Sequence, residues 1–156
     1  MKKIVICILV TLVIQLSHFV GGAIPADDRA ALIALYNATD GDNWSNKGGW
    51  KTPPLHTDGF ALPGTEGTWY GITVIDGRVH DVGLYHNNLN GSIPPELENL
   101  SYMQSLSLGK NQLSGGIPPE LGNLGNLRCL LLTENQLSGS IPSELGNIEY
   151  LYDLDL

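Results

Sequence analysis

The chain has 156 residues, enough for one domain, and its formal net charge of −8 reflects sixteen acidic against eight basic side chains. So acidic a chain is repelled by phosphate backbones, which excludes nucleic acid as an expected partner. With only two cysteines, Cys7 and Cys129, the sequence is not a disulfide-rich scaffold, so its stability must come from a core and a backbone ladder.

The first segment has the layout of a secretory signal peptide over residues 1–23. Lys2 and Lys3 precede an apolar run, and three small residues follow it at 21–23. An uncleaved membrane anchor is the alternative interpretation. It is less favoured because the run falls short of the ~20 apolar residues that a membrane-spanning helix needs. Cleavage would leave six basic and sixteen acidic residues, a charge of −10, on a secreted or cell-surface chain.

Residues 24–78 are predicted to cap the front of a repeat array. Asp27 or Asp28 is placed to cap a helix, and Gly41 is placed to end it. Residues 52–67 are rich in proline and glycine and indicate an irregular loop. One face of the predicted helix is apolar, and three tryptophans follow the helix. Together they predict the core of the cap: Leu32, Leu35, Tyr36, Trp44, Trp50 and Trp69.

From residue 79 onward the chain repeats itself every 24 residues. The units are 79–102, 103–126 and 127–150, and 151–156 begins a fourth. So many matching slots indicate a solenoid in which each unit is one coil. The matching slots include Leu84, Leu108 and Leu132; Asn87, Asn111 and Asn135; Gly91, Gly115 and Gly139; and Pro94, Pro118 and Pro142.

Each coil combines a short strand with a short helical turn. Leu106 and Leu108 alternate with small residues, which is strand spacing. Leu121 and Leu124 are three apart, which favours a 3₁₀ turn after the proline. The asparagine slot follows the strand, and because a buried amide must be satisfied, we expect it to bond to backbone groups of adjacent coils.

The segment "LSLGKNQLSGGIPPELGNL" at 106–124 resembles the plant-type leucine-rich repeat, and the resemblance covers about 79–156. It implies an α/β fold: a right-handed horseshoe solenoid with a parallel concave sheet, a 3₁₀ or irregular convex side and a helical N-terminal cap. The segments "DRAALIALYNATDGDNW" and "WYGITV" resemble the cap of secreted and receptor-type members. That family usually places cysteines near the positions of Thr68 and Val74, so this cap is a cysteine-less variant.

No catalytic constellation is visible, so we predict neither an enzyme nor a cofactor or metal site. The Asp40 and Asp42 segment fails the calcium-loop pattern, and His56, His80 and His86 lack partners at zinc spacing. Four sequons are candidates for N-glycosylation: Asn37, Asn43, Asn90 and Asn99.

The strand positions that point away from the core define columns on the concave face. Their residues vary while the framework does not, which predicts a binding face with Tyr85 and Leu131 as apolar anchors. The columns are Asp81, Ser105, Cys129 and Asp153; Gly83, Ser107, Leu131 and Asp155; Tyr85, Gly109 and Thr133; and His86, Lys110 and Glu134.

The leading hypothesis is a non-catalytic extracellular recognition module for a protein or peptide. One alternative is a carbohydrate, cell-wall or ice-surface binder, for which Tyr85 is the only aromatic residue in the columns and Thr133 has no counterpart in the other units. Another is the ectodomain fragment of a receptor kinase, because "LYDLDL" stops partway into a strand. The open edge there also predicts self-association.

Overall fold

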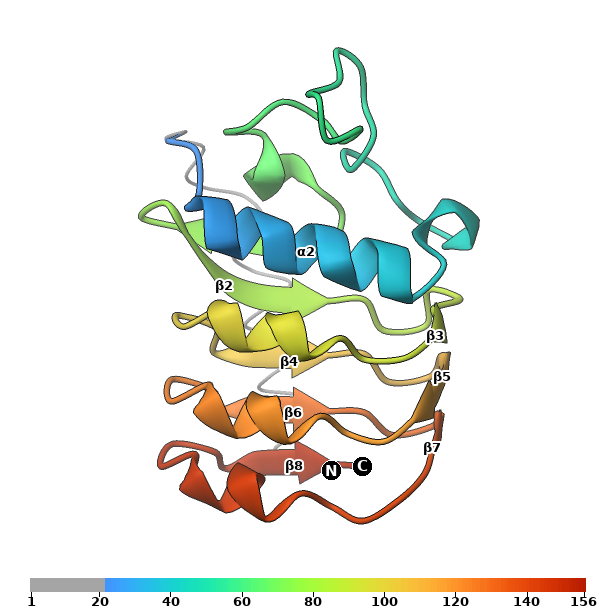
Figure 1. The fold of residues 1–156 in the computed structure, drawn as a ribbon, viewed down its shortest axis with the longest axis vertical. Helices are drawn as coiled ribbons and strands as arrows, with labels where there is room; N and C mark the ends of the chain where they lie inside the picture. Colours follow the sequence, from blue (N-terminus) through green and yellow to red (C-terminus); the bar gives the residue numbers. More distant parts are fainter. Residues whose placement is uncertain (1–21) are drawn as a thin grey trace.

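The computed structural model describes residues 22–156, so the predicted signal peptide lies outside the described residues except for its last two positions. Within 22–156, no helix combines the length and apolar character needed to cross a membrane. Figure 1 shows successive coils stacked along the long axis, with the cap at one end.

A five-stranded sheet forms one side of the stack. Its order is β1 (Ile72–Ile75), β2 (Arg78–Gly83), β4 (Ser105–Ser107), β6 (Cys129–Leu131) and β8 (Asp153–Asp155). The last four strands are parallel, and partners along them differ by 24 residues, as in Asp81 with Ser105. The 24-residue period of the sequence is therefore the register of this sheet.

The front edge of the sheet is covered by the cap. β1 runs antiparallel to β2, with an irregularity between Thr73 and Val74. An exposed strand edge is a template for unwanted pairing, and β1 occupies the edge of β2. The sequence predicted that residues before 79 cover the first coil, and this strand is how they do so.

On the opposite side, each coil contains a five-residue 3₁₀ helix: η4 (Pro95–Asn99), η5 (Pro119–Asn123) and η6 (Ser143–Asn147). Each follows a proline in an extended conformation, as expected from the IPxxL pattern. Leu97, Leu121 and Leu145 point from these helices into the core and are at most 5% exposed. The 3₁₀ prediction is confirmed.

A second, three-stranded parallel sheet was not predicted from the sequence. It consists of β3 (Asn90–Gly91), β5 (Gln112–Gly115) and β7 (Gln136–Leu137), stacked at one edge of the coils in Figure 1. At its front, the backbone nitrogen of Asn90 donates to the carbonyl of Thr39 at 3.0 Å. Added at Gly91, a Cβ atom would lie 2.0 Å from the carbonyl oxygen of Ala38, so only glycine fits there.

The asparagine ladder forms as expected. The amide nitrogen of Asn111 donates to the carbonyls of Leu84, Leu108 and Gly109 at 2.9, 2.8 and 3.1 Å. Its side-chain oxygen accepts from the backbone nitrogens of Asn87 and Leu89. Asn135 repeats the pattern one coil further on, donating to Leu108 and Leu132 and accepting from Leu113.

The cap joins the ladder through Asn87. The Asn87 side chain donates to the carbonyl of Asn46 at 2.9 Å and accepts from the backbone nitrogen of Asn46 at 2.7 Å. The loop around Asn46 therefore takes the place that the preceding coil takes for Asn111.

The cap helix α2 (Ala26–Ala38) is present, but its ends differ from the expectation. The N-cap residue is Pro25, and no side chain caps the helix. Asp28 is instead buried, accepting from Arg78 at 3.1 Å and from the backbone nitrogen of Val79 at 3.3 Å. Thr39 is the C-cap, and Gly41 begins the 3₁₀ turn η2 (Gly41–Asn43) beneath the ring of Tyr36.

The cap core is aromatic, as predicted for the tryptophans. Trp50 lies 4.7 Å from Trp69 and 5.1 Å from Trp44 between ring centroids, and all three are at most 4% exposed. Tyr36 and Phe60 complete the cluster. Large rings packed at these distances contribute burial and ring–ring attraction together.

A buried arginine holds the loop at residues 52–67. Arg29 donates to Asp58 at 2.8 and 3.1 Å and to the carbonyl of Ala61 at 2.7 Å. It also donates to Glu66, which is 1% exposed, and its guanidinium lies 5.1 Å from the ring centroid of Trp69. Glu66 begins the short 3₁₀ turn η3 (Glu66–Thr68), so the network ties helix, loop and turn together.

Candidate functional site

The predicted columns are aligned on the five-stranded sheet. Strand pairing places Asp81, Ser105, Cys129 and Asp153 side by side, and likewise Gly83, Ser107, Leu131 and Asp155. Among these, Asp81, Ser105, Cys129 and Leu131 are buried and the other four are half-buried. Cys129 and Leu131 form a small apolar cluster beside the main core.

Tyr85 is an exposed member of the columns, with 48% of its surface accessible. A Cβ atom built on Gly109 would lie 3.3 Å from the Tyr85 ring and 3.5 Å from the Thr133 methyl group. The missing side chain at Gly109 therefore lets the Tyr85 ring lie over the second coil and reach toward Thr133 on the third.

Asp81 lies at the cap end of its column. Burial raises the pKa of the Asp81 carboxyl above its ordinary value, opposed by the charge of His80 and a hydrogen bond from Thr73. Burial is the larger effect, so the folded protein favours the protonated form of this carboxyl more than water does.

The column of His86, Lys110 and Glu134 lies in the turn that follows each strand. All three residues have left-handed backbone conformations, with φ of 51°, 55° and 56°. Glycine or asparagine would adopt this conformation at less cost, since other residues pay roughly 1 kcal/mol for it. The chain keeps three long polar side chains there instead, and all three are exposed.

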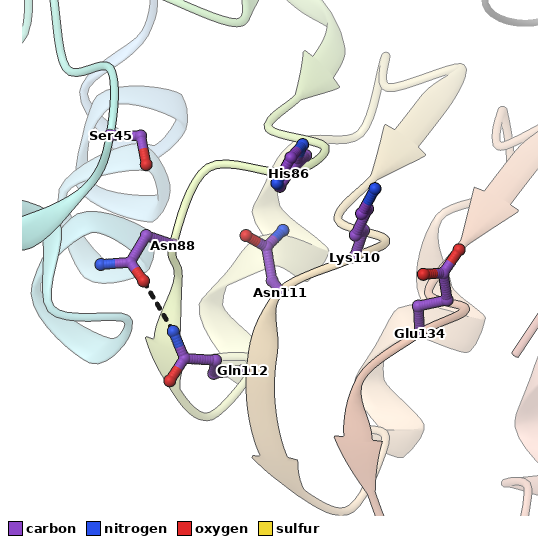
Figure 2. Close-up of a pocket in the computed structure, with 7 residues that line it drawn as sticks. All are labelled: Ser45, His86, Asn88, Lys110, Asn111, Gln112 and Glu134. Atoms are coloured by element: carbon purple, nitrogen blue, oxygen red, sulfur yellow. Dashed lines mark hydrogen bonds between the residues drawn. The ribbon is translucent and has the colours of Figure 1, made fainter.

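These turns line the hollow, a depression of about 310 Å³ that Figure 2 shows in close-up. His86, Lys110 and Glu134 form a row over successive coils, and Ser45 of the cap lies at one end. The remaining lining residues are Asn88, Asn111 and Gln112.

The side-chain amides in the hollow differ in the hydrogen bonds that they already make within the protein. The amide nitrogen of Asn111 is committed to backbone carbonyls. Gln112 donates to the side-chain oxygen of Asn88 at 2.6 Å, and Asn88 donates to the carbonyl of Asn43 at 2.9 Å. Asn88 and Gln112 are therefore bonded to each other and to the cap, and both are exposed.

Sequence reasoning placed the row on the concave face but missed Ser45, Asn88 and Gln112. Asn88 and Gln112 occupy one slot of the repeat, directly after the ladder asparagine, so the period could have identified them. Ser45 could not be found in this way because it belongs to the cap, outside the repeat. Its place follows from the bond between its backbone nitrogen and the carbonyl of Asn87.

The four sequons lie away from the five-stranded sheet, and their asparagines are all exposed. Asn37 is in α2, Asn43 in η2, Asn90 in β3 and Asn99 in η4. Within the described part of the chain, no three histidine, cysteine or acidic side chains gather as a metal site would require.

The Leucine Rich Repeat family model matches residues 79–100, 102–124 and 126–148. No curated protein matches the chain. The repeats, the parallel sheet and the asparagine ladder define a leucine-rich-repeat solenoid, and the three matched segments of this chain are leucine-rich repeats.

Among solved structures, the crystal structure of PEPR1–AtPEP1 is 29% identical with a TM-score of 0.67, covering 85% of this chain and 18% of that one. The BIR3–SERK2 complex from Arabidopsis thaliana is 28% identical with a TM-score of 0.68, covering 83% and 67%. The BIR2 ectodomain from Arabidopsis thaliana is 30% identical with a TM-score of 0.66, covering 83% and 65%. This chain thus spans less than a fifth of the first structure and about two thirds of the other two.

Proposed function

We propose that the chain is a non-catalytic extracellular recognition module that binds a protein or peptide through its concave face. The observation that carries the proposal is the contrast within each coil. The named leucine and asparagine slots repeat without change, whereas the side chains of the aligned strand columns vary along the stack. Tyr85, exposed and laid over Gly109, is the apolar anchor of this face.

Two of the similar structures are assemblies, PEPR1–AtPEP1 and the BIR3–SERK2 complex. A third is described as an ectodomain. Together with the signal-like segment at 1–23, these likenesses support an extracellular location and a binding role for this chain. Export from a eukaryotic host with Ile24 as the first residue of the product would support the signal peptide, and retention of Met1 on a membrane-bound product would contradict it.

The test begins by selecting a displayed library of random short peptides on the folded protein. Enriched peptides are then measured against the double variant Tyr85→Ala with Leu131→Ala. If the concave face binds them, the affinity falls by about tenfold or more, because a central aromatic anchor typically contributes above 1.4 kcal/mol.

The matched control replaces an exposed tyrosine and an exposed isoleucine outside the five-stranded sheet, Tyr150→Ala with Ile141→Ala. Circular dichroism and thermal melting establish that both double variants are folded. Equal binding by the concave variant and the wild type rules out this face, and failure to enrich any peptide argues against peptide recognition.

A further inference from the structure

Lys110 and Glu134 carry opposite charges on adjacent coils, yet they are not joined. None of the ion pairs within residues 22–156 includes either residue. Both are exposed, both line the hollow, and Figure 2 shows them projecting to the same side. Each charge is therefore free to meet a ligand group of the opposite sign.

The backbone fixes the spacing of the two turns that carry these charges. Lys110 donates its backbone hydrogen to the carbonyl of Thr133, so the two turns are stacked at the spacing of neighbouring strands, about 4.8 Å. In an extended peptide, residues two apart face the same side about 6.7 Å from each other. Two long side chains readily span the difference of roughly 2 Å.

The rest of the hollow favours a ligand that continues beyond this pair. The ring of Tyr85 contacts that of His86 at 6.3 Å between centroids, and His86 lines the hollow next to Lys110. An extended segment that crosses the coils would meet Glu134, then Lys110, and then the Tyr85 and His86 rings, before it reaches Ser45 of the cap. Asn88 and Gln112 are bonded to each other and to the cap, so we expect the charges of Lys110 and Glu134 to set the selectivity.

We infer that the hollow reads a charge pair in an extended peptide: an acidic residue held by Lys110 and a basic residue held by Glu134, two positions apart. The inference rests on the proposed peptide-binding function and specifies which peptides the charged residues of the hollow bind. A surface with charges of one sign would select peptides of the opposite sign. Because Lys110 and Glu134 carry opposite charges, this row selects the order of an acidic and a basic residue in the peptide.

The experiment uses the same displayed library of random short peptides at neutral pH and low salt. Peptides enriched on the wild-type protein should carry acidic and basic residues two apart about fivefold more often than the starting library. Fivefold is the factor that corresponds to one well-placed exposed ion pair. The enrichment should decline when the selection is repeated at high salt, because exposed pairs are screened.

A charge swap makes the test specific. The variant Lys110→Glu with Glu134→Lys keeps the net charge and inverts the row, so the selected order of acidic and basic residues should invert. The control swap, Arg128→Glu with Glu149→Lys, also keeps the net charge and changes two exposed residues; Arg128 lies at the opposite end of β6 from Glu134. It should leave the selected order unchanged.

An unchanged order on the Lys110 and Glu134 swap, or no excess of such pairs on the wild type, overturns the inference. The two proposals fail in different ways. If the swap has no effect while Tyr85→Ala with Leu131→Ala abolishes binding, the proposed binding by the concave face is supported. The inference that Lys110 and Glu134 select a charge pair is then refuted. If neither variant affects peptide binding, both fall.

Discussion

The side-chain oxygen of Asn111 accepts a hydrogen bond from the backbone nitrogen of Asn87, 24 residues earlier, at 2.9 Å. The same side chain donates to the carbonyl of Leu84 at 2.9 Å, so one amide joins two coils in both directions. This amide replaces backbone pairing at the point where the strand ends and the chain turns.

Replacing Asn111 with alanine should lower the free energy of unfolding by about 2–5 kcal/mol, because several backbone groups lose their partner in a half-buried turn. Chemical denaturation measures the change. Asn123→Ala is the control, since the Asn123 side chain is exposed and bonds only to the Glu98 carboxylate. Its cost should stay below about 0.5 kcal/mol, and similar costs for the two variants would refute the ladder's role.

Arg29→Met should destabilise the cap by about 3–5 kcal/mol, because the carboxylate of Glu66 would remain buried without its cation. Adding Glu66→Gln should recover part of the loss by removing the stranded charge. Lys51→Met, which breaks the exposed pair with Asp42, serves as the comparison and should cost less than about 1 kcal/mol. Thermal melts of the four proteins test the ranking.

The Arg29 network should also make stability depend on acid. The hydrogen bond from Arg29 holds the pKa of the Asp58 carboxyl well below its usual range. A lowered pKa in the folded state stabilises the protein above the unfolded value of about 3.9, and this contribution is lost as the pH falls below that value. Asp58→Asn should therefore flatten the pH dependence of the melting temperature between about pH 5 and pH 2, and an unaltered slope would contradict the assignment.

Gly122 and Gly146 occupy the same repeat slot in η5 and η6 but have different surroundings. A Cβ atom at Gly122 would lie 2.4 Å from the carbonyl oxygen of Glu144, whereas nothing described lies within 4 Å of one at Gly146. Gly122→Ala should cost about 1–3 kcal/mol by forcing η5 and η6 apart, while Gly146→Ala should be neutral or slightly stabilising. Equal melting temperatures for the two variants would show that the 3₁₀ helices are free to separate.

The repeat made much of the solenoid predictable. Because partners in the sheet differ by one period, the alignment of Asp81 with Ser105 followed from counting, and the alternation of Leu106 and Leu108 assigned the buried face. The short sheet of β3, β5 and β7 did not follow, since strands of two to four residues with at most one apolar side chain, such as Gln112–Gly115, are too short to show a strand pattern. It forms because the stacking of coils brings their backbones together.

The cap was predictable only in outline. The tryptophans indicated a core, but the partners of Arg29 and Asp28 are 29 to 51 residues away and follow no period. The hollow was likewise predicted only in part. His86, Lys110 and Glu134 were found from their shared slot, and Ser45 was not.

Asn46 of the cap takes the place of a preceding coil for Asn87, and this arrangement allows the chain to gain repeats. Asn87 meets the cap backbone in the manner in which Asn111 meets the first coil. A duplicated block of 24 residues inserted between β4 and β6 would therefore find its hydrogen-bonding partners ready on both sides. The molecule can grow in whole units, and each unit would add one strand to the five-stranded sheet while the cap stays as it is.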